Sequence, residues 1–168
     1  MPVPPRIAAA VEVLDPQPGD VVLEAGGGNG VSAQLICSRL GAGRLIALDR
    51  SAVATQRTLA RNAEHAEAGR LEAVTGSLGD LRGRDATVDR ALTVNVNVFW
   101  TSPADAELEA LRRVLRPGGL VVLAWGAEGP QPAARIVDAV TTGLDRHGFT
   151  AVASIDDPRL VGLTAVRP

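Results

Sequence analysis

The chain contains no lysine and no tyrosine, a single cysteine and only four aromatic residues among 168. The lone Cys37 excludes an intrachain disulfide and a zinc site built from several cysteines, and it suits a reducing compartment. No apolar run approaches the roughly 20 residues that a membrane span needs. The first twenty residues also lack the basic segment and long apolar core of a signal peptide. We therefore expect a cytoplasmic protein that has no membrane partner.

The charge pattern lacks a broad basic field. All 17 basic residues are arginine, the net charge is -2 and the pI is near 5.7, so electrostatics do not favour nucleic acid as a partner. Arg57 and Arg61 share a helical face, which we interpret as a solvated surface. Neither His65 nor His147 has acids or cysteines at ligand spacing, so we expect no metal site.

Strand-like and helix-like segments alternate along the chain, with short Gly/Pro turns between them. This pattern is typical of βαβ units around a parallel sheet, and the length and 46% hydrophobic content predict one domain over residues 1–168. Helices are expected at 4–14, 30–40, 51–68, 103–115 and 131–146, and strands at 20–25, 44–49, 70–76, 88–96 and 120–125. Only four residues separate two last strands, 149–155 and 160–167, which predicts an antiparallel hairpin.

The stretch "DVVLEAGGGNG", residues 20–30, places four glycines within five residues after the first strand. Such a turn lets the backbone approach a ligand closely. A dinucleotide fold would carry G-x-G-x-x-G, but Val31 stands at the third glycine position, and without lysine no phosphate-binding P-loop is possible. Asp49, 19 residues after Gly30, can accept both hydroxyls of an adenosine ribose, a group that NAD and S-adenosylmethionine share.

Taken together, the motifs resemble the class I S-adenosylmethionine-dependent methyltransferases over nearly the whole chain, from about Gly19 to Arg167. The similar segments are "PGDVVLEAGGGNG", "LIALDRS", "AVTGSLGDL", "VDRALTVNVNVFW", "LRRVLRPGGLVVLAW" and "RHGFTAV". The resemblance implies a Rossmann-like three-layer α/β/α sandwich with a seven-stranded, mainly parallel sheet in the order 3-2-1-4-5-7-6 and an antiparallel last strand. It further implies a cofactor-binding half at 19–95 and an acceptor-side half at 96–168.

The resemblance also assigns roles to residues that would hold S-adenosylmethionine and its product S-adenosylhomocysteine. The glycine backbone would pass under the methionine part, and Asp49 would hold the ribose. Glu24 would contact the amino group, although it could instead only favour the N-terminus of the following helix. The expected cofactor-binding residues are Glu24, Gly26, Gly28, Gly30, Asp49, Arg50, Ser51, Ser77, Leu78 and Asn95.

The acceptor side is less defined. The segment "NVNVFW" after the fourth strand should line the pocket mouth, with Asn97 and Trp100 as candidate acceptor contacts, while His147 or Glu128 would serve as a base only if loops bring them inward. For Phe99 we favour an anchoring role. The short N-terminal region predicts an open pocket, closed by a bulky acceptor or by the first helix together with the partner in a homodimer.

The hypothesis at this point is in-line methyl transfer to a small-molecule acceptor. Two alternatives stay open. A non-catalytic protein that binds S-adenosylmethionine or S-adenosylhomocysteine would keep the glycine turn and Asp49 but lack an acceptor site. A nicotinamide-dependent oxidoreductase would need the same ribose contact.

Overall fold

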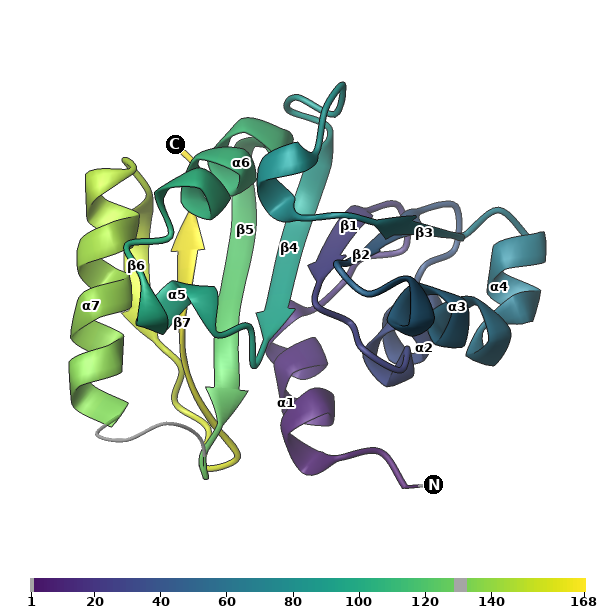
Figure 1. Ribbon diagram of the computed structural model, residues 1–168, viewed down its shortest axis with the longest axis horizontal. Coiled ribbons are helices and arrows are strands. Elements are labelled where there is room, and N and C mark those ends of the chain that lie inside the picture. Colours follow the sequence, from purple (N-terminus) through teal and green to yellow (C-terminus); the bar gives the residue numbers. More distant parts are fainter. Residues whose placement is uncertain (1, 129–132) are drawn as a thin grey trace.

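The computed structural model describes residues 2–128 and 133–168, and within them the chain forms one seven-stranded sheet (Figure 1). The strand order is β3-β2-β1-β4-β5-β7-β6. The five strands β3, β2, β1, β4 and β5 pair in parallel with their neighbours. Strand β7 is antiparallel to both β5 and β6, which confirms the predicted order and the closing hairpin. The strands are β1 Val21–Ala25, β2 Arg44–Asp49, β3 Leu71–Thr75, β4 Val88–Val94, β5 Leu115–Gly126, β6 Thr150–Ser154 and β7 Leu160–Val166.

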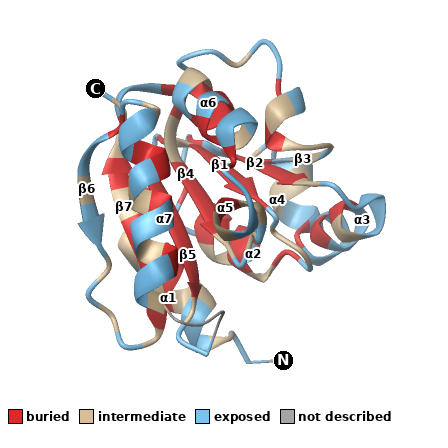
Figure 2. Cartoon of the chain, turned by 60° about the vertical axis from the view of Figure 1, so that its left-hand side comes forward, coloured by how far each residue is buried: buried red, intermediate tan, exposed pale blue. Residues whose placement is uncertain are grey.

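Helices cover both faces of this sheet and give the expected three layers (Figures 1 and 2). One face carries α1 to α4, and the other carries α5, α6, α7 and a short 3-10 turn, η1. The helices are α1 Pro5–Leu14, α2 Val31–Cys37, α3 Ala52–Arg61, α4 Ala63–Glu67, η1 Leu78–Asp80, α5 Val98–Thr101, α6 Asp105–Val114 and α7 Ala133–Arg146. The expected start of the last helix, Gln131, lies outside the described residues.

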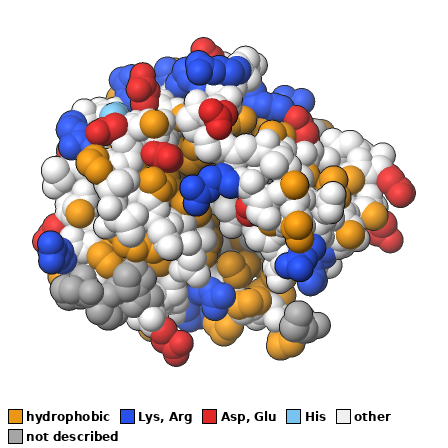
Figure 3. Space-filling view, in the orientation of Figure 1, with side chains coloured by type: hydrophobic (Ala, Val, Ile, Leu, Met, Phe, Trp, Pro, Cys, Tyr) orange, Lys and Arg blue, Asp and Glu red, His pale blue; other side chains and the backbone are white. Residues whose placement is uncertain are grey.

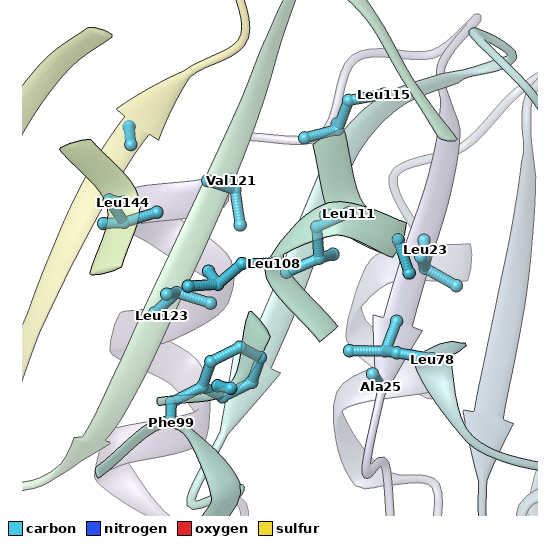
Figure 4. Close-up of a cluster of buried hydrophobic side chains, with 14 of the residues drawn as sticks. Leu23, Ala25, Leu78, Phe99, Leu108, Leu111, Leu115, Val121, Leu123 and Leu144 are labelled. Atoms are coloured by element: carbon cyan, nitrogen blue, oxygen red, sulfur yellow. The ribbon is translucent and has the colours of Figure 1, made fainter. Parts of the chain in front are cut away.

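Two hydrophobic cores, one on each face of the sheet, arise because successive side chains along a strand point to opposite faces. In β1, Val22 faces α1 and α2, whereas its neighbour Leu23 joins the opposite cluster. Figure 4 shows that second cluster, which includes Leu23 of β1, Leu108 and Leu111 of α6, and Phe99 of α5. Because both faces of the central strands are buried, the sheet fixes the ends of those strands, where the loops of the site begin.

The expected single helix over 51–68 is wrong, because it breaks at Asn62. This residue leaves helical geometry, with φ -118° and ψ 32°, and its side chain is buried. Its Nδ2 donates to the carbonyl oxygens of Thr58 and Gly30, at 2.9 and 3.0 Å. A side chain that bonds to nearby backbone competes with the helix ladder. The chain therefore divides into α3 and α4 at the point where it is tied to the glycine turn.

Two further boundaries differ from the predictions. The second helix ends at Cys37 rather than at residue 40. Strand β5 begins at Leu115, directly after α6, rather than at Leu120. Pro117 to Gly119 do not separate helix from strand but form a bulge in the strand, since Leu115 pairs with Val88 and Leu120 with Arg90. Hydrogen bonds to Arg167 at the end of the chain hold this bulge in the sheet.

Candidate functional site

A cavity of about 290 Å³ opens at the carboxyl ends of β1, β2, β3 and β4. Its walls are the ends of β1 and β2, the loop 76–78 after β3, the segment 95–98 after β4, and Glu107 of α6. Strand β1 lies between β2 and β4, so the connections run to opposite sides of it. Ligands of open α/β sheets bind in the crevice at such a switch point.

Gly26, at the start of the glycine turn, lines this cavity, whereas Gly28 and Gly30 do not. Gly26, Gly28 and Gly30 all have positive φ, at 79°, 60° and 75°, a conformation that costs other residues free energy. A Cβ at Gly26 would lie 2.6 Å from the Val96 side chain, whereas a Cβ at Gly28 would meet no atom within 4 Å. The turn is therefore packed against Val96 at Gly26, whereas the space beside Gly28 is free of protein atoms.

Side chains of α3 hold the carbonyl groups of the same turn. Thr58 Oγ1 donates to the carbonyl oxygen of Gly28, at 3.4 Å. Arg61 Nε donates to that of Asn29 at 2.8 Å, and Asn62 Nδ2 to that of Gly30 at 3.0 Å. Arg57 and Arg61 are both exposed, as expected of a solvated face, but Arg61 also holds the turn through this bond. Positions i, i+3 and i+4 share one helical face, a spacing that could have indicated this contact in the sequence.

Gly30 allows α3 to pack closely against the glycine turn. A Cβ there would lie 2.8 Å from Thr58 Cα, so only glycine lets α3 approach the turn. Gly30 is buried and does not line the cavity.

Asp49 closes β2 with its carboxylate held by the backbone of two neighbouring segments. Oδ2 accepts from the Gly28 N–H at 3.1 Å, and Oδ1 accepts from the Ser51 N–H at 2.9 Å. A carboxylate offers about four lone-pair sites, so each oxygen keeps one for a further donor in the cavity, which Asp49 lines. Ser51 does not line it; its Oγ caps α3 by accepting from the Ala54 N–H.

Glu24 is a carboxyl group buried beneath the turn, with only 2% of the residue exposed. Burial raises its pKa to about 7, a hydrogen bond from Ser32 acts in the opposite direction, and the negative charge of Asp49 adds to the increase. Oε2 lies 2.7 Å from the place of a Cβ at Gly27 and has no hydrogen-bond partner. A buried carboxylate oxygen without a donor is costly, so this atom marks a place where a donor or cation would be stabilised.

The other wall begins at the end of β4. Asn95 has a positive φ of 59°, which asparagine tolerates better than most residues. Its Oδ1 accepts from the Gly126 N–H at 3.1 Å and so joins the ends of β4 and β5. Asn97 follows it along the cavity edge, exposed to solvent. Arg50, Ser77 and Leu78 line the opposite side, so the structure brings together residues expected from three separate motifs.

The structure corrects the expectations for the remaining acceptor candidates. Trp100 packs on Trp125, with ring centroids 5.5 Å apart, and lines none of the cavity. Phe99 is buried in the core, which agrees with the anchoring role favoured for it. His147 bonds to Asp105 at 2.8 Å and lies in a separate hollow at the end of α7. Glu128 is exposed beyond β5. Helix α7 carries His147 to the opposite edge of the sheet, which no local motif could indicate.

Arginine side chains gather along that opposite edge, above α6 (Figure 3). Most of them are paired: Arg113 with Asp85 at 2.5 Å, and Arg146 with Asp105 at 2.5 Å. Over residues 2–128 and 133–168, no group of three or more His, Cys, Asp or Glu side chains is placed to hold a metal ion. In the same part of the chain, no helix is long and apolar enough to cross a membrane.

Comparisons with known proteins agree with this geometry. A family model described as a methyltransferase domain matches residues 22–119, more than half of the chain. Protein-L-isoaspartate O-methyltransferase of Methylorubrum populi is 30% identical over 156 residues, covering 93% of this chain and 68% of that protein. The chain therefore belongs to the class I S-adenosylmethionine-dependent methyltransferases, which use S-adenosylmethionine as the methyl donor. The nicotinamide alternative is thereby wrong.

Solved structures share the fold at low identity. A SAM-dependent methyltransferase from Aquifex aeolicus has a TM-score of 0.77 at 18% identity, covering 96% of this chain and 89% of that chain. Geranyl diphosphate C-methyltransferase from Streptomyces coelicolor A3(2) has a TM-score of 0.74 at 14% identity, covering 96% and 79%. These likenesses establish the architecture, including the antiparallel β7.

Proposed function

We propose that the cavity holds S-adenosylmethionine with its methionine part over the glycine turn, its ribose on Asp49 and its adenine beside Ser77 and Leu78. The observation that carries this assignment is the Asp49 carboxylate, which two backbone N–H groups fix at the cavity wall while it keeps lone pairs for two hydroxyl donors. Hydrogen bonds to a charged acceptor contribute about 1.5–3 kcal/mol each.

Two further features fit the methionine part. The space above Gly28 is free of protein atoms within 4 Å of a Cβ position, so a ligand can lie directly on the backbone there. The unpartnered Oε2 of Glu24 lies under the same turn. A cationic amino group, directly or through water, would provide the donor that this oxygen lacks and favour the ionised carboxylate.

The chemistry follows from the bound cofactor: a lone pair of the acceptor atom bonds to the sulfonium methyl carbon as the carbon–sulfur pair leaves with sulfur, giving S-adenosylhomocysteine, and the acceptor gives up a proton where it carries one. The protein's part is to orient and to exclude water. Among the described residues lining the cavity, Asp49 and Glu107 are the only carboxylates, and neither histidine nor cysteine is present. An acceptor that ionises readily or carries a neutral lone pair suits this site.

We further propose a small organic acceptor that enters past Asn97 and Val98, at the open side of the cavity. The methyltransferase from Streptomyces coelicolor is named for such a substrate, geranyl diphosphate. The relative from Methylorubrum populi is instead named for a carboxyl group in a protein. An isoaspartyl peptide therefore belongs in any acceptor panel.

The experiment combines binding and turnover on the full chain. S-adenosylhomocysteine should bind in calorimetry, and at 100 times its dissociation constant it should stabilise the fold by roughly 2.7 kcal/mol. Methyl-labelled S-adenosylmethionine is then incubated with small nucleophiles, the isoaspartyl peptide and cell extract, and products are identified by mass spectrometry. Transfer to a small molecule supports the proposal, and transfer only to the peptide overturns the acceptor class.

One competing function rests on a specific observation, the lack of histidine and cysteine along the described cavity walls. A protein that binds the cofactor without transferring its methyl group would need no such residue. Tight binding of S-adenosylhomocysteine with no labelled product from any acceptor or extract would favour this alternative.

A further inference from the structure

One carboxylate in the cavity wall has no role in the site described so far. Glu107 lies in the first turn of α6, is half-buried, and lines the cavity together with Ser77 and Leu78. Within the described part of the chain its side chain makes no hydrogen bond or ion pair. Its negative charge therefore faces the cavity without a protein partner.

The other acidic residue near this wall is already engaged. Asp80 Oδ2 accepts from Ser77 Oγ at 2.5 Å, and the side chain of Asp80 points to solvent rather than lining the cavity. Ser77 donates its only hydroxyl proton in that bond, so its side chain can offer a ligand only the neutral lone pairs of Oγ. A charged acceptor forms a stronger hydrogen bond, and on this side of the cavity Glu107 supplies it.

The position of Glu107 relative to the loop after β3 is fixed by packing along α6. Leu108 and Leu78 belong to one buried cluster, and a Cβ at Gly79 would lie 3.8 Å from that of Ala106 (Figure 4 shows Leu78 and Leu108). At the far end of the helix, Arg113 bonds to the carbonyl oxygen of Leu81. Contacts at both ends hold α6 against residues 78–81, so the backbone that carries Glu107 is fixed beside the loop before a ligand binds.

We infer that Glu107 is a specificity residue for the nucleobase, accepting a hydrogen bond from the exocyclic amino group of adenine. This inference rests on the proposed placement of the cofactor, with adenine beside Ser77 and Leu78. A carboxylate only accepts. It therefore favours a 6-amino purine, which donates at that position, over a 6-oxo purine, which presents a second acceptor and leaves two acceptors facing each other.

The test compares S-adenosylhomocysteine with its deaminated analogue, S-inosylhomocysteine, by calorimetry. The wild-type protein should prefer the adenosyl compound by about 100-fold, less than the roughly 10⁴-fold or more of fully buried polar sites, because Glu107 is only half-buried. Glu107→Gln places both a donor and an acceptor at the site, so it should weaken binding of the adenosyl compound about tenfold and reduce the preference to a few-fold. Melting temperature without ligand should stay unchanged.

Glu109→Gln is the matched control, because Glu109 is exposed on the same helix and lies outside the cavity. It should bind both ligands as the wild-type protein does. Unchanged affinity and preference in Glu107→Gln, with normal binding by the wild-type protein, would overturn the inference and leave the proposed function standing. Failure of the wild-type protein to bind S-adenosylhomocysteine would overturn both.

Discussion

The two walls of the cavity differ in how firmly the protein holds them. On the β1–β2 side, α3 side chains bind three consecutive carbonyls of the glycine turn, and Asp49 binds the N–H groups of Gly28 and Ser51. On the β4 side, Asn95 forms two hydrogen bonds to β5, with the Gly126 N–H and with the Ala124 carbonyl oxygen, and Val96 and Val98 pack against the core. The first wall is held at several points by side chains from distant segments, whereas the second has a side-chain bond to a distant strand only at Asn95 among the described residues.

This difference matches the demands on the two sides. A wall that always holds the same cofactor gains from fixed geometry, since ordering it on binding costs free energy. A wall that receives the acceptor must admit and release it, and loops that move belong to the less stable parts of a fold. The contrast predicts that substitutions on the β1–β2 side act on cofactor affinity, and those on the β4 side act on transfer.

The largest effect is expected for Asp49→Ala. It removes the proposed acceptor of both ribose hydroxyls and leaves the N–H groups of Gly28 and Ser51 without their partner. With two charge-assisted bonds of about 1.5–3 kcal/mol each, affinity for S-adenosylhomocysteine should fall at least 100-fold in calorimetry. The affinity of Asp49→Asn, which keeps one acceptor oxygen, should lie between those of the wild-type protein and Asp49→Ala. Unchanged binding by a folded Asp49→Ala protein would contradict the role of this residue.

Glu24→Gln tests the same wall through pH. Because burial raises the pKa of Glu24 from 4.5 to about 7, the native state binds more protons than the unfolded state between these values. The stabilising contribution is complete below pH 4.5 and is lost as pH rises through about 7, a difference of roughly 3 kcal/mol. Glutamine does not titrate.

Unfolding by urea at pH 4.5, 6 and 8 measures this difference in free energy between the two proteins. Glu24→Gln should be more stable than the wild-type protein at pH 8 by up to roughly 3 kcal/mol, and the advantage should shrink toward pH 4.5. A difference that does not change with pH would show that Glu24 is not held neutral by burial.

The fold was predictable because its signals are local and repeated. The alternation of strands and helices predicted a parallel sheet, the four residues between the last two strands predicted the hairpin, and the resemblance to the methyltransferases implied the strand order. The break at Asn62 was not predictable from helical periodicity, since it depends on a contact with Gly30, 32 residues away. The extra length of β5 likewise depends on pairing with β4 and β7 across the bulge.

The same dependence on contacts between distant residues separates the site residues that could be predicted from those that could not. Gly26 and Asp49 could be placed because each lies directly at a strand end, where sequence position determines position in space. Glu107 could not, because only the packing of α6 on η1 decides which turn of the helix faces the cavity. His147 was a candidate base only if loops brought it inward, and the structure places it after α7, outside the cavity.

The smallest effect is expected at Asn95, on the β4 side. Asn95→Gly removes the bond to the Gly126 N–H but relaxes the positive φ of 59°, and two opposed terms of about 1 kcal/mol leave stability nearly unchanged. Because the Asn95 side chain is already bonded to β5, affinity for S-adenosylhomocysteine should stay within about threefold. Methyl transfer should slow more than that, since the wall proposed for the acceptor loses its side-chain bond to β5 and alignment suffers.

Asn95→Ala is the matched control, because it loses the same bond and keeps the strained φ. It should lower the free energy of unfolding by about 1–2 kcal/mol in urea, while affinity again stays within about threefold. If either variant lost affinity as far as Asp49→Ala does, the segment 95–98 would be part of the fixed cofactor wall, and the distinction between the two sides of the cavity would fail.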